Sequence, residues 1–177
     1  MKKFELTTEF VTNIRGRKLF RIKALVAFGN VEAGELGGYI EREENLSQEG
    51  NAWVYGDAKV YGDAKVYGDA EVYGDAEVCG DAEVCGDAEV YGDAEVCGDA
   101  EVCGNADYAI VKGFGSCYRT TTFFRTKTKE IAVKCGCFLG TLAEFRLRVQ
   151  STHGESKTAK EYLMLADLME YKFGEEK

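Results

Sequence analysis

Residues 54–78 read VYGDAKVYGDAKVYGDAEVYGDAEV, and the same hexapeptide continues to Cys103. The unit Val-(Tyr/Cys)-Gly-Asp-Ala-(Lys/Glu) begins nine times, at Val54, Val60, Val66, Val72, Val78, Val84, Val90, Val96 and Val102. A unit this short cannot close a hydrophobic core alone, so successive units must stack and bury one another's apolar residues. The repeat therefore predicts a solenoid.

The order of residues within the unit predicts which side chains point inward. Ala and the following Val lie two residues apart, so on an extended strand they share one face, while Lys or Glu and Tyr or Cys share the other. Gly-Asp supplies the corner, because Gly reaches positive φ without steric cost and Asp tolerates turn geometry. We expect a mainly β fold, a parallel β-helix with a thin Val/Ala interior.

A Val followed four residues later by a small Ala resembles the hexapeptide pattern of left-handed β-helices. That resemblance implies a single-stranded left-handed helix with three hexapeptides in each triangular coil. The Tyr/Cys positions support an eighteen-residue coil independently, because residues with this spacing sort by type. The three faces are Tyr55, Tyr73, Tyr91; Tyr61, Cys79, Cys97; and Tyr67, Cys85, Cys103.

The acidic charge of the chain is concentrated in the repeat. The chain has 177 residues and a formal net charge of −9. Residues 51–107 carry −13, whereas residues 1–50 are neutral and residues 108–177 carry +4. This length suits one elongated domain with appendages. We expect three parts: an N-terminal β cap (1–37), the hexapeptide-repeat helix (38–107) and a C-terminal α+β module (108–177).

Compartment and redox state follow from two further observations. The N-terminal residues MKKFELTTEFV contain no long apolar run, and no other segment approaches the length of a membrane span. We therefore expect a cytoplasmic chain that does not contact a membrane. The seven cysteines come without a secretion signal, which favours free thiols over a disulfide framework.

The N-terminal part predicts a β-hairpin, with strands at residues 3–11 and 18–26. In the second strand Phe20, Ile22 and Ala24 alternate with charged residues, which is typical of a half-buried strand. The Gly-rich segment 29–38 lacks Walker spacing and the Lys-Ser/Thr pair, so we expect turns there and not a phosphate loop.

The first coil is expected to start near residue 38. Tyr39-Ile40 and Leu46 precede Ala52 at six-residue intervals, so they extend the repeat register upstream. Residues 18–25 (KLFRIKAL) and 34–58 (GELGGYIEREENLSQEGNAWVYGDA) resemble the YdcK-like group of hexapeptide-repeat proteins from bacteria and phages. The resemblance covers residues 3–107 and implies a left-handed helix with an N-terminal β cap. Members are often labelled transferases or polymer-forming proteins, and the transferase label rests on fold analogy.

The C-terminal module is expected to have the order β-β-β-α-α. Residues 108–113, 118–126 and 130–138 predict strands, the last two forming a hairpin. Thr141 and Glu144 form a capping-box pattern that opens a helix ending at His153-Gly154, with Leu142, Phe145 and Val149 on one face. A second helix is expected from Lys157 to Phe173, with an apolar stripe of Ala159, Tyr162, Leu163, Ala166, Met169 and Phe173. The module should pack on the end or flank of the β-helix and cover an open sheet edge.

Catalytic residues are not expected. Hexapeptide acyltransferases, as a family, use a His general base, and this chain has one His, at position 153, outside the repeat. A lone His in a turn lacks a partner to orient it. We therefore expect no catalytic residue and no cofactor, and an acyltransferase remains the alternative function.

A metal site is not expected either. Cys117, Cys135, Cys137 and His153 could supply four zinc ligands, but the paired spacings of structural zinc sites are missing. We expect strand cysteines, with Cys135 and Cys137 on one strand face. The ladder cysteines 79, 85, 97 and 103 have no accompanying His. If the coil has eighteen residues, however, Cys79 lies under Cys97 and Cys85 under Cys103, and mild oxidation should join these pairs.

The outward ladders are the candidate binding surface. They comprise Tyr55, Tyr73, Tyr91, Asp57, Asp63, Asp69, Asp75, Asp81, Asp87, Asp93, Asp99, Glu71, Glu77, Glu83, Glu89, Glu95 and Glu101. One explanation is a solvated surface kept for solubility. Another is a negative rod for a basic protein partner, which could imitate the phosphates of nucleic acid. Divalent cation binding fits less well, because corners on separate coils do not converge. The tyrosine face forms an aromatic strip that we expect a cap helix or partner subunit to cover.

The function expected from the sequence is a non-enzymatic binding or scaffold protein, with phage origin suggested by the resemblance. Its rigid acidic surface would engage a basic protein, without direct nucleic-acid binding by the repeat. The alternatives are a hexapeptide-type acyltransferase and a self-assembling filament protein, with homo-oligomer contacts through the Tyr and Cys faces.

Overall fold

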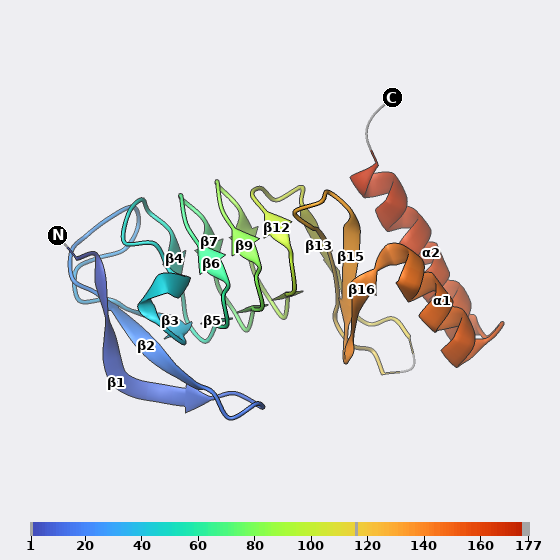
Figure 1. The fold of residues 1–177 in the computed structure, drawn as a ribbon, viewed down its shortest axis with the longest axis horizontal. Coiled ribbons are helices and arrows are strands. Elements are labelled where there is room, and N and C mark those ends of the chain that lie inside the picture. The colour runs from blue at the N-terminus through green and yellow to red at the C-terminus, as the bar shows by residue number, and fades with distance from the viewer. Residues whose placement is uncertain (1, 116, 175–177) are drawn as a thin grey trace.

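The repeat folds into a parallel β-solenoid of about four turns (Figure 1). The structure is a computed structural model that describes residues 2–115 and 117–174. Three columns of parallel strands form the sides of the coil. They comprise β3 (Leu36–Ile40), β5 (Lys59–Val60), β8 (Glu77–Val78) and β11 (Glu95–Val96); β4 (Trp53–Val54), β7 (Glu71–Val72) and β10 (Glu89–Val90); and β6 (Lys65–Val66), β9 (Glu83–Val84) and β12 (Glu101–Val102).

The coil repeats every eighteen residues, as the Tyr/Cys pattern predicts. Val54 pairs with Val72, Val60 with Val78 and Val66 with Val84. Backbone amides on the strands donate to carbonyl oxygens of the next coil, as in Tyr55 N to Val72 O at 2.8 Å. The period is confirmed because every strand in the regular part has its hydrogen-bond partner eighteen residues away.

The first coil is longer, which corrects the expected register. Ile40 pairs with Val60 and Leu46 bridges Val66, both at a separation of twenty residues, whereas Trp53 pairs with Glu71 at eighteen. The two extra residues therefore lie between Leu46 and Trp53. After the short 3-10 helix η1 (Glu43–Asn45), Ser47 N donates to Val66 O, and the chain rejoins the regular register at Asn51, whose N–H donates to Gly68 O.

The interior is a column of small aliphatic side chains. Every Val and Ala of the repeat, from Ala52 to Val102, has an exposed fraction of 0%. At the corners Gly adopts φ between +58° and +75°, a region that a side chain disfavours. Stacking these units gives each coil its apolar neighbours, which a single hexapeptide could not supply.

The N-terminal end of the column is closed by a β-hairpin. Strands β1 (Phe4–Thr12) and β2 (Lys18–Ala24) pair antiparallel, and β2 joins β3 of the solenoid. Phe4 and Ile22 are fully buried on Trp53 and the first coil. The expected alternation in β2 fails at Phe20, which is partly exposed while Leu19 is buried, because both strand pairs contain a register irregularity.

The C-terminal end is closed by a four-stranded antiparallel sheet. Its strands are β13 (Tyr108–Val111), β14 (Thr121–Arg125), β15 (Ile131–Cys135) and β16 (Phe138–Thr141). The expected three-strand order was wrong: Gly136 turns the chain at φ +58°, and β16 follows as a fourth strand. The sheet also covers the open edge of the last coil, since Thr126 bridges Ala100 and Lys127 N donates to Asp99 O.

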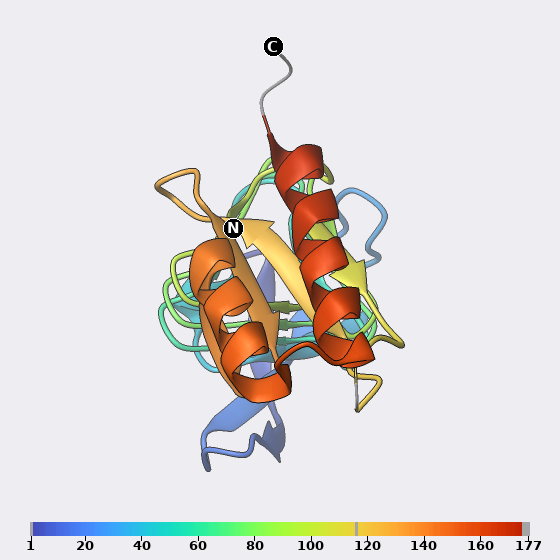
Figure 2. The same cartoon turned by 90° about the vertical axis from the view of Figure 1, so that its right-hand side faces the viewer.

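Two helices pack on the outer face of this sheet (Figure 2). Helix α1 (Leu142–His153) begins at the expected capping box of Thr141 and Glu144, and α2 (Lys157–Phe173) has the expected bounds. Leu165 is buried in α2 in place of the expected Leu163, which is partly exposed. In β14, Phe124 faces the solenoid core and Phe123 faces the helices, so one strand joins the two cores.

Among the helices of residues 2–115 and 117–174, neither α1 nor α2 combines the length and the apolar character that a membrane crossing requires.

Candidate functional site

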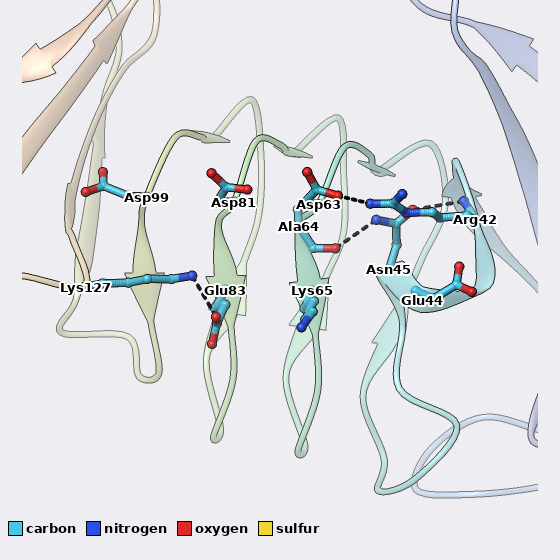
Figure 3. A pocket seen from close by; sticks show the side chains of 10 residues that line it. All are labelled: Arg42, Glu44, Asn45, Asp63, Ala64, Lys65, Asp81, Glu83, Asp99 and Lys127. Atoms are coloured by element: carbon cyan, nitrogen blue, oxygen red, sulfur yellow. Dashed lines mark hydrogen bonds and ion pairs between the residues drawn. The ribbon is translucent and has the colours of Figure 1, made fainter.

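The corner aspartates form columns along the solenoid, because residues eighteen apart lie on the same corner. Asp63, Asp81 and Asp99 occupy one corner and line a groove of about 470 Å³ (Figure 3). The groove is bounded at its N-terminal end by Arg42 and at its C-terminal end by Lys127, which reaches over from the C-terminal sheet. The remaining corners hold Asp57, Asp75 and Asp93, and Asp69 and Asp87.

Both ends of the groove already hold a basic side chain of the same molecule. Arg42 pairs with Asp63 and donates to Gly62 O at 2.7 Å. Lys127 Nζ lies 2.7 Å from Glu83 Oε1. The hydrogen bond from Lys127, and a second from Tyr67, lower the pKa of Glu83, while Glu83 raises the pKa of Lys127. The groove thus accommodates both a guanidinium and an ammonium group.

The other two aspartates of the groove are not paired in this way, although Lys65 also lines the groove and the charge of Asp81 contributes to the raised pKa of Lys127. In the part of the chain that the structure describes, the carboxylates of Asp81 and Asp99 make neither a hydrogen bond nor an ion pair. Adjacent coils lie about 4.8 Å apart, and exposed like charges at such a spacing repel one another by about 1 kcal/mol in water, which favours a cation between them. Asp75 and Asp87 on the other corners share this property, so Asp81 and Asp99 are distinguished by the groove that they line with Arg42, Lys65 and Lys127.

The glutamates of the flat faces are different, because each has a partner in its own chain. Parallel pairing sets Glu71 beside Glu89, Glu77 beside Glu95 and Glu83 beside Glu101. Tyrosine hydroxyls donate to four of them from the preceding coil: Tyr55 to Glu71, Tyr61 to Glu77, Tyr67 to Glu83 and Tyr73 to Glu89, at 2.8–3.1 Å. Lys134 and Lys129 of the C-terminal module bind Glu95 and Glu101.

These glutamates therefore contribute less to an external site than their number suggests. Sequence reasoning missed the Tyr–Glu pairs, although the signal was present. A Tyr at position i and a Glu at i+16 always lie on neighbouring coils in this repeat. The hydrogen bond also raises the pKa of the tyrosine, after the larger effect of burial, as at Tyr67.

Two corner aspartates, and Asp107 just after the repeat, are also engaged within the chain. Lys112 pairs with Asp93, Arg125 lies 3.5 Å from Asp107, and Asn51 donates to Asp69 at 2.8 Å. The basic C-terminal module thus neutralises part of the acidic solenoid on which it packs. The charge left over is concentrated at the corners of the middle coils.

The tyrosine face is less continuous than expected. Tyr73 and Tyr91 stack with ring centroids 5.7 Å apart, and Tyr91 contacts Tyr108 edge-on at 6.1 Å. Tyr55 stands outside this stack, and among the described residues its hydroxyl bonds to Glu71. Neither α1 nor α2 covers the strip, because both pack on the far side of the C-terminal sheet. Tyr91 remains 45% exposed.

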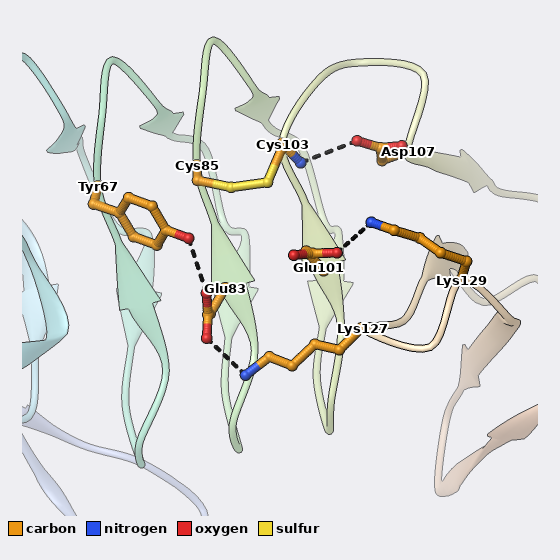
Figure 4. Close-up of a disulfide and its surroundings, with 8 residues drawn as sticks. All are labelled: Tyr67, Glu83, Cys85, Glu101, Cys103, Asp107, Lys127 and Lys129. Atoms are coloured by element: carbon orange, nitrogen blue, oxygen red, sulfur yellow. Dashed lines mark hydrogen bonds and ion pairs between the residues drawn. A yellow bond between two sulfur atoms is a disulfide. The ribbon is translucent and has the colours of Figure 1, made fainter.

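The ladder cysteines form two disulfides, Cys79–Cys97 and Cys85–Cys103. Figure 4 shows the second. The expectation of free thiols was wrong for these four residues. Stacking brings each pair to a Cα separation of 4.6 or 4.3 Å, close to the range that a disulfide requires. These are the pairs that the eighteen-residue coil predicts.

The other cysteines gather with the single histidine at the C-terminal end. Cys117, Cys135, Cys137 and His153 all line one cavity between the sheet and the helices. Cys135 and Cys137 do not share a strand face, contrary to expectation, because Gly136 places a turn between them. Within the described residues no group of His, Cys, Asp or Glu has an arrangement that could hold a metal ion.

No protein-family model and no curated protein matches this chain.

Proposed function

We propose that this chain is a non-enzymatic binding or scaffold protein that presents the Asp63–Asp81–Asp99 groove to a basic protein segment. We also propose that it belongs to the YdcK-like hexapeptide-repeat group and that its solenoid is left-handed. One observation carries the binding proposal: Arg42 and Lys127 occupy the two ends of the groove, and the carboxylates of Asp81 and Asp99 in the same groove form neither a hydrogen bond nor an ion pair with a described residue.

The occupied ends indicate the chemistry of the partner. Because the groove binds one arginine and one lysine of its own chain, a segment with spaced Lys or Arg residues would continue the same pattern across its middle. Such charge-assisted bonds are stronger than neutral ones and are weakened by salt at exposed sites. A regular row of carboxylates also resembles a row of phosphates, so nucleic-acid-binding proteins are a suitable partner class.

The rigidity of the surface supports this use. The aspartates follow glycine corners fixed by backbone hydrogen bonds to the next coil, such as Asp81 N to Gly98 O at 2.8 Å. A partner that binds here does not have to order the surface first, which lowers the entropic cost of association. The same geometry would suit a scaffold that holds a partner in one orientation.

Acyl transfer is not part of the proposal. His153 ends α1 and lines the C-terminal cavity, so it does not lie on the coils where the hexapeptide acyltransferases carry out their chemistry. A steady turnover of acetyl-CoA that His153→Ala abolished would overturn this part of the proposal.

The binding test uses a labelled twelve-residue peptide with Lys at every second position and a matched peptide with Glu in its place. We expect the Lys peptide to bind and the Glu peptide not to bind. At 0.05 M salt the Asp81→Asn/Asp99→Asn variant should bind the Lys peptide with about tenfold lower affinity. The matched control is Asp75→Asn/Asp87→Asn, which removes the same charge from other corners.

Three results would contradict the groove. Equal loss in both double variants would show that binding depends on net charge alone. Unchanged binding in the Asp81/Asp99 variant would show that the peptide binds elsewhere. Affinity that stays constant between 0.05 and 0.5 M salt would exclude an electrostatic mode, since the screening length falls from about 14 Å to about 4 Å over that range.

A further inference from the structure

The C-terminal module contains a cavity of about 380 Å³ that is separate from the acidic groove. Its walls come from the loop that precedes β14, from the β15–β16 hairpin, and from the facing sides of α1 and α2. A volume of this size is within the range of small-molecule sites. The cavity therefore has room for a ligand of about ten heavy atoms.

The charge of this cavity is opposite to that of the chain. Arg119 and Arg148 line it, and none of its described lining residues carries a carboxylate, although the chain has a net charge of −9. Neither guanidinium forms an ion pair with a described residue. Arg146, two residues before Arg148 on α1, is paired with both Asp167 and Glu170. The two cavity arginines are therefore available to an anion.

The lining of the cavity also contains a series of rings in contact. The ring centroids of Phe138 and Phe145 are 5.6 Å apart, those of Phe145 and Tyr162 are 5.7 Å apart, and those of Tyr162 and His153 are 5.9 Å apart. Val149 completes this apolar surface. Rings arranged in this way offer both faces and edges to the aromatic ring of a ligand. Such ring pairs contribute more binding free energy than the burial of apolar area alone.

Local contacts hold the lining of the cavity in place. The hydroxyl of Tyr162 is hydrogen-bonded to Cys135, and burial followed by this neighbour raises the pKa of Tyr162 to about 12. Cys135 Sγ in turn accepts a hydrogen bond from Thr121 Oγ1 at 3.3 Å. Arg119 lies across the Gly136 turn, where a Cβ would come within 2.6 Å of its Nη1. The site is thus largely formed before a ligand arrives.

We propose that this cavity binds a small aromatic anion, a carboxylate or a phosphate monoester. The anionic group lies between Arg119 and Arg148, and the ring packs on Phe145 and Tyr162. Arginine suits this role because its planar fork can donate two parallel hydrogen bonds to such oxygens. The proposal does not depend on the acidic groove.

The test titrates the full-length protein with benzoate, with phenyl phosphate and with the neutral isostere benzamide, followed by amide NMR shifts. We expect at least one of the two anions to bind with a Kd on the order of 1 mM, as befits so small a ligand, and to bind at least about tenfold tighter than benzamide. The shifts should concentrate in α1, α2 and the β15–β16 turn. The preferred anion identifies the headgroup.

Two variants and one chemical readout locate the site. Arg119→Gln and Arg148→Gln should each weaken anion binding about tenfold, whereas Arg146→Gln, with the same change on the same helix but outside the cavity, should leave it unchanged. Independently, saturating anion should slow alkylation of Cys137, which is exposed and lines the cavity.

The proposal is overturned if benzamide binds as tightly as both anions, or if neither anion binds below about 10 mM, well above the expected range. It is also overturned if Arg146→Gln weakens binding as much as the two cavity variants. The alkylation of Cys137 uses the unaltered protein, so it decides the matter even if an arginine variant fails to fold. Alkylation at the same rate with and without a saturating anion would place the ligand elsewhere.

Discussion

Cys85 and Cys103 are eighteen residues apart in the sequence and 4.3 Å apart at their Cα atoms, joined by a disulfide across neighbouring coils (Figure 4). Cys79 and Cys97 repeat the relationship on the next face. The pairs follow from the pitch of the solenoid, which places residue i+18 directly beside residue i. Each bond joins two coils that are already held by backbone hydrogen bonds.

The first prediction concerns which cysteines pair. Mild oxidation of the reduced, folded protein should give the 79–97 and 85–103 bridges, because only same-face cysteines are close enough. Peptide mapping under non-reducing conditions identifies the bridges. Abundant 79–85 or 97–103 linkage would show that the coil does not have three hexapeptides.

The second prediction concerns what these bridges contribute. Each closes a loop of eighteen residues, for which chain entropy predicts a stabilisation of about 3 kcal/mol. The Cys97→Ser/Cys103→Ser variant should therefore unfold at lower denaturant concentration than the oxidised protein, and equally with or without reductant. Reductant should lower the denaturation midpoint of the parent protein toward that of the variant. A denaturation midpoint of the parent protein that stays the same with and without reductant would contradict this prediction.

The third prediction compares two neighbouring residues of β14. Phe124 is buried against the solenoid core and Phe123 against the helices, each with an exposed fraction of 0%. Either substitution by Ala should cost about 3–5 kcal/mol. Hydrogen exchange should separate them: Phe124→Ala should release the amides of β11 and β12 first, and Phe123→Ala those of α1 and α2. The same exchange pattern in both variants would mean that the two cores are not separate.

The fourth prediction uses two corner glycines with different surroundings. Gly56 and Gly80 both have positive φ, but a Cβ at Gly56 meets nothing within 4 Å, while one at Gly80 lies 2.9 Å from Gly98 N. Gly56→Ala should cost about 1–2 kcal/mol for the backbone conformation alone. Gly80→Ala should cost a further 1–3 kcal/mol or so, because the backbone of the next coil must move. Chemical denaturation measures the loss of stability in each variant. Equal losses would contradict a close contact between the corners of stacked coils.

The fifth prediction concerns pH. Lys3 is 4% exposed and donates to Ala52 O at 2.9 Å, and burial lowers its pKa from 10.5 to about 8. Between these two values the unfolded chain binds more protons than the folded one. The contribution of Lys3 to stability is therefore lowest below pH 8, rises with pH, and is fully recovered above 10.5.

Lys3→Met removes this titration while keeping the length of the side chain. The free energy of unfolding of the parent protein, relative to this variant, should rise by up to about 3 kcal/mol between pH 7.5 and 10.5. Denaturation curves at several pH values measure the difference, in which effects of the shared Cys and Tyr residues cancel. Lys2→Met controls for the loss of one positive charge. A parent-to-variant difference that is constant with pH would contradict a lowered pKa.

Local residue patterns predicted much of the architecture. The Val/Ala spacing determined the buried column, the Gly-Asp pairs determined the corners, and the Thr141–Glu144 box determined where α1 begins. The strand β16 was missed because Gly136 is a single turn residue between two apolar stretches. The twenty-residue first coil was missed because Leu46 also fits a six-residue register with Ala52.

The candidate sites divide in the same way. Stacking of identical units fixes neighbours by sequence offset, so the sequence alone determined the aspartate columns and the disulfide pairs. Only the tertiary structure decided which carboxylates remain without a partner, because that depends on where Lys127, Lys129 and Lys134 of the C-terminal sheet reach the coils. The cavity that joins Arg119, Cys135 and Arg148 is likewise a tertiary result. Its residues come from a loop, a strand and a helix, which are not copies of a repeated unit. They meet because the sheet packs on the solenoid through Phe124 on one face and on the helices through Phe123 on the other.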